Sequence, residues 1–497
     1  MKQDYIIGID QSTQGTKALL FDPQGCLLAR EDLPHRQIVD QRGWVEHDPE
    51  EIYQNTVKVI QNLLGKTAVS PEAVKAIGIS NQRETAMVWD KRTGKPVYNA
   101  IVWQCARGAA ICERLKAENP ENALKVRERT GLPLSPYFSA AKLAWLVENV
   151  EAARQGNDEG TLCFGTMDSW LVYRLTRGRV FCTDYSNASR TQLFHIGNLC
   201  WDEEICNMFG LNPACLPQVC DSDAHYGDTD LEGLFPAAVP IHSVLGDSHG
   251  ALFGQGCLEK GMVKATYGTG SSVMMNVGEA PVYSQNGAVS SLAWKLGGKL
   301  NYVLEGNINY TGAVITWLKD QVGLISDPAQ TEELARRANP SDHTYLVPAF
   351  TGLGAPYWDS QAEAILCGMT RTTGRAEIVK AALECIAYQI ADMAETMRKD
   401  SGIAIRELRV DGGPTKNAYL MQFQSDLLGL RVQVPKAEEL SGIGAAYAAG
   451  LAIGLYRPET LFSGINRTSY LPDMAEEERE RRIAGWRRAV GMVLNTK

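Results

Sequence analysis

The sequence predicts an α/β protein with two large domains, and three observations lead to this prediction. At 497 residues the chain is too long for one hydrophobic core, so two domains are expected. β-rich and helical patterns alternate along the chain, which is typical of central sheets covered by helices. Two glycine-rich hairpins, residues 5–22 and 263–276, each open a large half of the chain. We therefore expect domains at residues 1–254 and 255–497, with the boundary within 250–258.

The individual elements follow from the period of the apolar residues. Residues 75–80 form a continuous buried-strand pattern, whereas residues 50–64 place apolar side chains at helical spacing. In the second half we expect a helix, a short strand and a second helix, at residues 375–397, 408–411 and 417–428.

Each hairpin joins two β-rich stretches through a turn of small and hydroxylated residues. Glycine lets backbone N–H groups approach an anion closely, and successive N–H groups form an anion-binding concavity. Ser and Thr add hydroxyl donors, and Asp10 is able to hold a hard cation through oxygen or through its waters. One such turn mostly just joins strands. Two of them indicate two domains that grip one polyphosphate between them.

Composition excludes several other classes of function. The formal charge of -9 argues against nucleic acid or an anionic membrane as the main partner. No apolar run reaches the roughly 18 residues of a membrane span, and the chain enters strand residues too early to leave room for a signal peptide. The 12 cysteines include no Cys-x-x-Cys pair and the 7 histidines no His-x-x-x-His pair. We expect a cytoplasmic protein with reduced thiols and no transition metal.

Motifs spread over the whole chain give it a recognisable identity. The matching segments, in chain order, are residues 43–49 (GWVEHDP), 81–85 (NQRET), 99–104 (NAIVWQ), 137–145 (YFSAAKLAW), 184–191 (DYSNASRT), 348–358 (PAFTGLGAPYW), and 411–413 (DGG) followed by 420–424 (LMQFQ). With them the chain resembles the FGGY carbohydrate kinases, most closely the glycerol kinase branch. The resemblance implies two actin-like (ribonuclease H-like) ATPase domains around a central cleft, and transfer of the ATP γ-phosphoryl group to a sugar or polyol hydroxyl. It also suggests a homo-oligomer, a dimer or a tetramer.

The resemblance further implies the ATP site. Asp10 would be the carboxylate on the Mg²⁺ side. The phosphates would meet the first hairpin at Thr13, Gln14 and Lys17 and the second at Thr269 and Gly270, and the adenosine side would be formed by Gly312, Thr316, Gly413 and Asn417. Two positions depart from the family pattern, because Lys17 stands where arginine is usual and Thr316 where glutamine is usual. Lysine supplies positive charge but no bidentate fork.

Asp247 is the expected general base. It follows the apolar Val244-Leu245 pair, where a strand end would deliver a carboxylate into the cleft to take the proton of the acceptor hydroxyl. On its own, an aspartate in this position is more often a turn or a helix N-cap. The motif match favours the base.

The resemblance implies an acceptor pocket in which this chain keeps some residues and changes others. Arg83, Glu84, Trp103, Tyr137 and Asp247 are retained. Without the family context, Arg83–Glu84 would be a surface ion pair of little energetic value and the two aromatic residues would belong to the core. Four positions differ from the usual ones: Ser272 for a phenylalanine, Ser248 and His249 for two glutamines, and Cys105 for an acidic residue.

The changed pocket leaves the acceptor open. Loss of an aromatic wall at Ser272 leaves room for more atoms, so a four- or five-carbon polyol competes with glycerol. The first hairpin, Asp10-Gln11-Ser12-Thr13-Gln14, is more similar to that of the pentulose kinases. A ketopentose of the xylulose type is therefore the alternative acceptor. A non-catalytic actin-like nucleotide-binding protein is the alternative of another class, and it would not need to keep an acceptor pocket.

Overall fold

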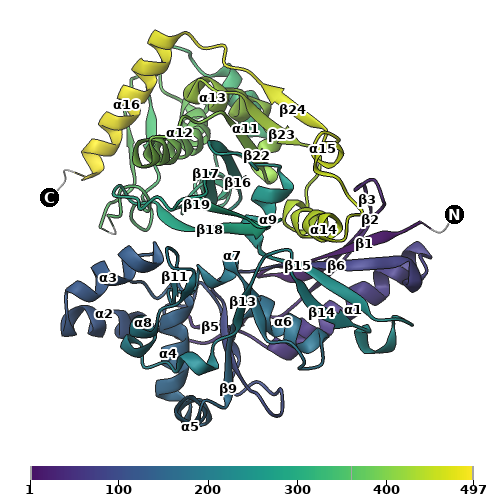
Figure 1. Cartoon of the computed structure of the whole chain (residues 1–497). Coiled ribbons are helices and arrows are strands. Elements are labelled where there is room, and N and C mark those ends of the chain that lie inside the picture. The colour runs from purple at the N-terminus through teal and green to yellow at the C-terminus, as the bar shows by residue number, and fades with distance from the viewer. Residues whose placement is uncertain (1–2, 360, 495–497) are drawn as a thin grey trace.

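A computed structural model describes residues 3–359 and 361–494, and two large mixed sheets organise it (Figure 1). The first sheet has the order β14-β15-β6-β1-β2-β3 and the second the order β18-β19-β17-β16-β22-β23-β24. The strands of the first are β1 (Tyr5–Gln11), β2 (Gly15–Phe21), β3 (Leu27–Pro34), β6 (Val74–Asn81), β14 (His225–Thr229) and β15 (Val239–Gly246). Those of the second are β16 (Met262–Tyr267), β17 (Ser271–Gly278), β18 (Val289–Leu296), β19 (Lys299–Ile308), β22 (Glu407–Asp411), β23 (Val432–Pro435) and β24 (Arg467–Tyr470).

The two sheets repeat one pattern of strand directions. In the first, β1 and β2 form an antiparallel hairpin, β3 continues it, and β6 and β15 add parallel strands on the other side. In the second, β16 and β17 form the hairpin, β19 continues it, and β22 and β23 add the parallel strands. The likeness of the two hairpins in the sequence therefore extends to two whole sheets.

The strands and helices expected from periodicity are present. Residues 75–80 lie in β6, and residues 50–64 lie in α1 (Pro49–Thr67), whose first turn is capped by Asp48 through a 2.9 Å bond from the Glu50 amide. The other three become α12 (Arg375–Ser401), β22 and α13 (Ala418–Leu428). Residue 250, where the expected boundary begins, lies inside α9 (Asp247–Gly254).

A smaller layer lies beside the first sheet and carries the aromatic residues of the expected pocket (lower part of Figure 1). Its five-stranded sheet contains β4 (Ile38–Val39), β5 (Val45–His47), β8 (Ala100–Ile101), β7 (Ala86–Asp90) and β9 (Leu162–Thr166). Its helices are α2 (Ala109–Glu118), α3 (Glu121–Thr130), α4 (Ser139–Asn149) and α5 (Glu151–Glu159).

In the lower half, α6 (Met167–Leu175) packs on the first sheet (Figure 1). In the upper half, α12 packs on the second sheet, α10 (Gly312–Asp320) and α11 (Gln330–Arg337) pack against α12, and α16 (Glu476–Leu494) packs against α13. Short elements complete the fold: β10 (Cys182–Asp184), α7 (Tyr185–Ala188), β11 (Phe194–His195), β12 (Cys200–Trp201), α8 (Glu203–Met208), β13 (Gln218–Cys220), β20 (Tyr345–Val347), β21 (Ile365–Cys367) and α15 (Pro458–Leu461). In the described part of the chain, no helix combines the length and the apolar character needed to cross a membrane.

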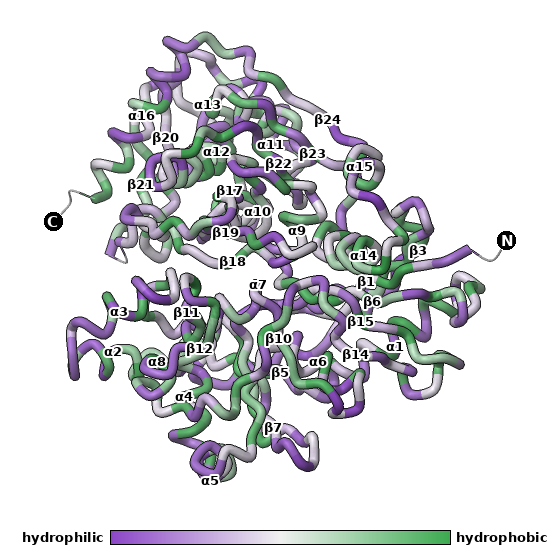
Figure 2. Tube along the Cα trace, in the orientation of Figure 1, coloured by the Kyte–Doolittle hydropathy of each residue, from purple (hydrophilic) through white to green (hydrophobic). Residues whose placement is uncertain are grey.

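Two helices join the halves of the molecule. The largely apolar α14 (Leu440–Ala452) lies in the chain between β23 and β24 of the second sheet but packs on β1 and β6 of the first (Figures 1 and 2). It also packs against α9, and there the backbones touch: a Cβ on Gly444 would lie 1.9 Å from the carbonyl oxygen of Gly250. On its other side, a Cβ on Gly78 would lie 2.2 Å from the oxygen of Ala445. Only glycine permits these approaches.

Candidate active site

Both glycine-rich turns close as hairpins at the ends of their strands. In the first, the Ser12 amide donates to the Gly15 carbonyl at 2.8 Å, and in the second the Gly268 amide donates to the Gly270 carbonyl at 2.8 Å. Gln14 and Thr269 are exposed at the two tips. Both turns therefore present backbone and side-chain donors to solvent.

The N-terminus of α10 lies against the second hairpin. The Gly312 amide donates to the Gly268 carbonyl at 2.9 Å, and a Cβ at Gly312 would lie 2.5 Å from that oxygen, so glycine is needed here. The positive end of this helix thus lies next to the turn, an arrangement suited to phosphate. One turn further on, Thr316 is exposed and its Oγ1 contacts the Gly312 carbonyl at 3.4 Å.

The Gly412-Gly413 turn lies beside the same hairpin because β16 and β22 run parallel and pair Thr266 with Asp411 at their ends. Gly412 has a φ of 100°, and a Cβ there would lie 1.9 Å from the carbonyl oxygen of Tyr267. Asn417 caps α13 by accepting from the Leu420 amide at 2.9 Å. The residues expected on the adenosine side therefore follow the C-terminal ends of the central strands of the second sheet or begin the helix beside them.

Lys17 of the first hairpin is already paired with two carboxylates. Its ammonium lies 2.7 Å from Glu439, which also binds Arg30, and 3.6 Å from Asp10. Burial raises the pKa of Asp10 to about 6; Lys17 opposes the shift, and the negative charges of Glu439 and Asp247 add to it. Asp10 and Glu439 are therefore two buried carboxylates that share Lys17, with the more exposed Arg30 as a second counter-charge to Glu439.

Arg83 is the centre of a second group of charged side chains, separate from the group formed by Lys17, Asp10 and Glu439. Its Nε donates to Oδ1 of Asp247 at 2.9 Å, and one terminal nitrogen donates to Ser248 Oγ at 3.0 Å. Its two terminal nitrogens form a fork on the carboxylate of Glu305, at 2.8 and 2.9 Å. Asp247 begins α9 directly after β15, as the sequence suggested, and its side chain is 36% exposed. An incoming hydroxyl can therefore reach this carboxylate.

The surface ion pair considered for Arg83 and Glu84 is absent from the described residues, because each side chain is buried and has other partners. Glu84 accepts from Arg190 Nε at 2.6 Å, and Arg190 also lies 2.9 Å from Glu305. The backbone of Glu84 has a φ of 58°, a conformation that costs energy for a residue with a side chain. Glu305 is completely buried, yet the two arginines hold the pKa of its carboxyl below the usual range.

The aromatic residues connect the two clusters. Trp103 Nε1 donates to Thr13 Oγ1 of the first hairpin at 3.0 Å, and the ring centroids of Trp103 and Tyr137 lie 5.5 Å apart. Buried Lys142 fixes the loop of Tyr137 by donating to the carbonyls of residues 136, 137 and 138, at 2.7, 2.5 and 3.1 Å. Both rings pack against apolar clusters on one side and are only partly buried, so part of each stays open.

The four changed positions of the expected acceptor pocket divide into two groups. Ser248 and Ser272 are partly exposed, and both contact the Arg83 cluster: Ser272 Oγ lies 3.4 Å from Glu305 Oε1. His249 and Cys105 are buried, so neither is open to an acceptor. Only the two serines change the wall near Arg83.

The sequence matches known proteins over its full length. Residues 5–254 match the N-terminal domain, and residues 263–453 the C-terminal domain, of the FGGY family of carbohydrate kinases. The chain belongs to this family. It is an ATP-dependent carbohydrate kinase with two actin-like α/β domains.

Individual relatives of this FGGY kinase agree with that assignment. It is 47% identical over 492 residues to a glycerol kinase of Alkaliphilus oremlandii, covering 99% of this chain and 97% of that protein. A glycerol kinase 1 of Thermotoga maritima is 46% identical and is covered to 99% on both sides. The structure of Plasmodium falciparum glycerol kinase with ADP superposes with a TM-score of 0.94 at 35% identity, covering 100% of this chain and 99% of that one. A xylulose kinase of Rhodospirillum rubrum, at 19% identity and a TM-score of 0.88, shares the fold.

Sequence reasoning missed three charged residues of this kinase's site: Arg190, Glu305 and Glu439. Glu305 had a visible signal, because it is the single charge inside the apolar strand pattern of residues 302–306. An isolated charge in a buried strand is rarely tolerated unless it is paired. Arg190 lies inside a matched motif but was given no role.

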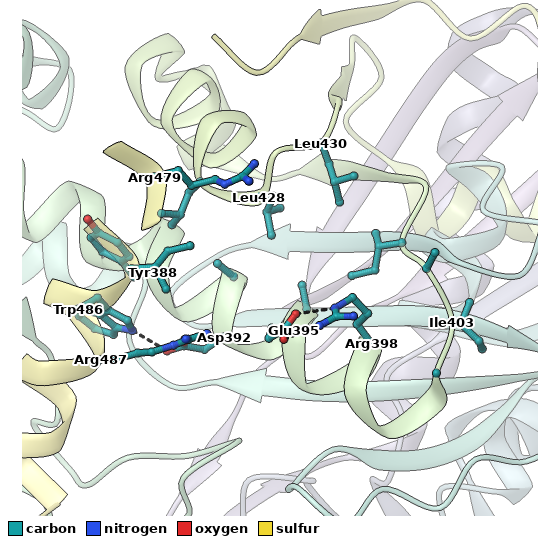
Figure 3. A pocket seen from close by; sticks show the side chains of 17 residues that line it. Tyr388, Asp392, Glu395, Arg398, Ile403, Leu428, Leu430, Arg479, Trp486 and Arg487 are labelled. Atoms are coloured by element: carbon teal, nitrogen blue, oxygen red, sulfur yellow. Dashed lines mark hydrogen bonds and ion pairs between the residues drawn. The ribbon is translucent and has the colours of Figure 1, made fainter. Parts of the chain in front are cut away.

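A separate cavity of about 510 Å³ contains none of the expected site residues. It lies between α12, α16 and the segment that follows α13, with Trp486 and Arg398 at opposite ends (Figure 3). Apolar side chains such as Leu428 and Ile403 share its lining with the ion pair of Glu395 and Arg398.

Two histidines under the first hairpin predict a loss of stability in acid. His35 Nε2 donates to the Thr13 carbonyl at 2.9 Å, and its ring contacts that of His47. Burial, with His35 beside it, lowers the pKa of His47 to about 3 from an ordinary 6.5. The unfolded chain therefore binds more protons between about pH 3 and 6.5, so the free energy of unfolding falls as pH drops through that range, by on the order of a few kcal/mol.

Thermal melts of wild type and His47→Gln between pH 4 and 8 measure this effect. We expect a flatter acid limb for His47→Gln and an unchanged limb for the control His225→Gln, whose side chain is exposed. Equal slopes for wild type and His47→Gln would contradict the assignment.

Proposed function

We propose that this FGGY kinase phosphorylates a terminal hydroxyl of a small polyol, glycerol or a related C4–C5 polyol. The observation that supports this best is the partly exposed carboxylate of Asp247, held by Arg83 and electrostatically coupled to Asp10 of the first hairpin. Glycerol kinases are also the relatives with high identity over the whole chain. A nucleotide-binding protein without catalysis has no need of this arrangement.

In the proposed reaction Asp247 accepts the proton of the attacking hydroxyl. Among the described residues both hydrogen bonds to this carboxylate end on Oδ1, from Arg83 and from the Ser248 amide. Oδ2 is therefore left to take the proton. Arg83 would orient the acceptor together with Trp103 and Tyr137, and the two hairpins would hold the phosphates in line with the hydroxyl.

Mg²⁺ fits the charges of this site. The described residues contain no group of three His, Cys, Asp or Glu side chains that would form a metal cage by themselves. Mg²⁺ commonly uses one or two carboxylates, waters and the phosphates of the substrate. Asp10, with Asp247 nearby, meets that need; burial raises the pKa of Asp10, the negative charges of Glu439 and Asp247 add to the shift, and a bound cation would oppose it. When bound, the ion would neutralise charge on the phosphates.

The division into domains, the oligomeric state and the cellular location of this kinase are proposals. We place the acceptor-binding domain at residues 1–254 and the ATP-binding domain at residues 255–497; the support is that the strands of the two large sheets lie at residues 5–246 and 262–470. A homo-oligomer and a cytoplasmic location remain predictions from the sequence.

A panel of acceptors tests the proposed function. ADP release is measured with MgATP and C3–C6 polyols and ketoses, each at several concentrations. We expect ADP release to depend on a polyol. Equal ADP release with and without every acceptor would contradict the proposal, and preference for a pentulose would move the substrate to ketoses.

Ser272→Phe is expected to shift the preference toward glycerol. The ring would add apolar contact with a short carbon chain and fill the space that a longer one needs. Differences of about one methylene in a pocket are worth about 1–3 kcal/mol, so we expect a partial shift. The measurement is the ratio of kcat/KM for glycerol to that for the best C4–C5 acceptor. Ser272→Ala is the control, because it removes the hydroxyl without adding volume. Ser290→Phe would not serve, because Ser290 is buried.

A further inference from the structure

Ser272 and Asn307 form a polar, partly open pair on the second sheet. They are direct cross-strand partners on β17 and β19, and the next partners on the same face are Met274 and Glu305. Met274 and Glu305 are fully buried, whereas Ser272 and Asn307 are partly exposed. The face therefore changes from covered to open at this pair.

This opening adjoins the residues that hold the acceptor in the proposed function. Ser272 Oγ lies 3.4 Å from Glu305 Oε1, and the same carboxylate accepts both hydrogen bonds of the Arg83 fork. Strand β18, the neighbour of β19, begins at Val289, which pairs with Glu305. Asn307 therefore has no β18 residue beside it, and the sheet leaves that side uncovered.

The chemistry of Asn307 suits a hydroxylated ligand. Its carboxamide forms no hydrogen bond with any side chain or backbone group in residues 3–359 and 361–494. An amide offers two donors and an acceptor, and a hydroxyl is both donor and acceptor. The alternative is that Asn307 has no ligand and is solvated by water near the end of its strand.

We propose that Asn307 and Ser272 form a subsite for a hydroxyl farther along the acceptor, so that the preferred class of acceptor is an acyclic polyol of four or five carbons. This inference rests on the proposed function, because Asp247 and Arg83 must hold the reacting end. A longer polyol carries additional hydroxyls from Arg83 toward Ser272, where the wall is polar. Asn307 is then a residue that determines specificity.

Kinetics of the whole enzyme test the subsite. Values of kcat/KM are measured for glycerol, erythritol, ribitol and xylitol in wild type, Asn307→Ala and Asn307→Leu. We expect both substitutions to lower kcat/KM for the preferred C4–C5 polyol about three- to tenfold, the size of one neutral hydrogen bond, and to leave glycerol nearly unchanged. Asn301→Ala, near the other end of β19, is the matched control and should change none of the four.

Binding without ATP separates this inference from the proposed function. The shift in Tm caused by each polyol reports its binding even in a protein with no turnover. If no acceptor supports ADP release, the kinase proposal fails, but a C4–C5 polyol that raises the Tm of wild type and not of Asn307→Ala still supports the subsite.

Four results would overturn the inference: no polyol raises the Tm, glycerol is preferred over every longer polyol, Asn307→Ala weakens all four acceptors equally, or a ketose is preferred by more than tenfold. The first three are read from these two assays, and the fourth from the panel of polyols and ketoses that tests the proposed function.

Discussion

Asp247→Asn is expected to lower kcat by about 10²–10⁴ while ATP binding is retained. The amide cannot take the hydroxyl proton, but it has nearly the same volume and still accepts a hydrogen bond from Arg83 Nε. Both hairpins are untouched by the change. Steady-state kinetics with the best acceptor and calorimetric titration with a non-hydrolysable ATP analogue measure the two quantities.

The matched control is Asp320→Asn, at the exposed end of α10. It should keep wild-type kcat. A purified Asp247→Asn enzyme with kcat near that of wild type would remove Asp247 from the role of base.

Glu305→Gln is expected to raise the KM for the acceptor and to lower kcat/KM by about one to two orders of magnitude. Glu305 pairs with Arg83 and Arg190 and is completely buried, so an amide leaves two buried guanidinium groups without their shared counter-charge. Hydrogen bonds to charged groups are worth about 1.5–3 kcal/mol, and loss of one partner of a buried pair costs about 3–5 kcal/mol. We therefore expect a lower Tm as well.

Comparing the KM for the acceptor with the affinity for the ATP analogue distinguishes a positioning role of Glu305 from a general loss of stability. If Glu305 acts by placing Arg83, the KM for the acceptor rises while the affinity for the ATP analogue changes little. Glu333→Gln, which removes an exposed ion pair on α11, should change neither. An equal loss of affinity for both substrates would show that Glu305 only stabilises the fold.

The sequence predicted the fold well because its signals are local or repeated. Periodicity located α1, β6 and α12, and the glycine, serine and threonine residues of both hairpins identified their turns. The tertiary ion pairs were not predictable in the same way. Glu305 reaches Arg83 across 222 positions of sequence and Glu439 reaches Lys17 across 422, and no local pattern records such a contact.

The departures from the family pattern show the same limit. The sequence predicts Ser248 and Ser272 as acceptor-binding residues, whereas His249 and Cys105 are only changed residues near matched motifs. Burial separates them, since His249 and Cys105 are closed off and the two serines are not. Substitution alone therefore does not identify a specificity residue; its access to solvent is also needed.

The backbone contact between α9 and α14 has a mechanical consequence. Interlocked side chains resist sliding, because each must leave its groove before the helices can move. At Gly250 and Gly444 there are no side chains to disengage, and Gly78 likewise offers α14 a smooth surface. We therefore expect small rotations of the two halves about this contact, limited by the apolar side chains around it, such as Phe253 and Ile443, and by the ion pairs of Glu305 and Glu439 that bridge the halves.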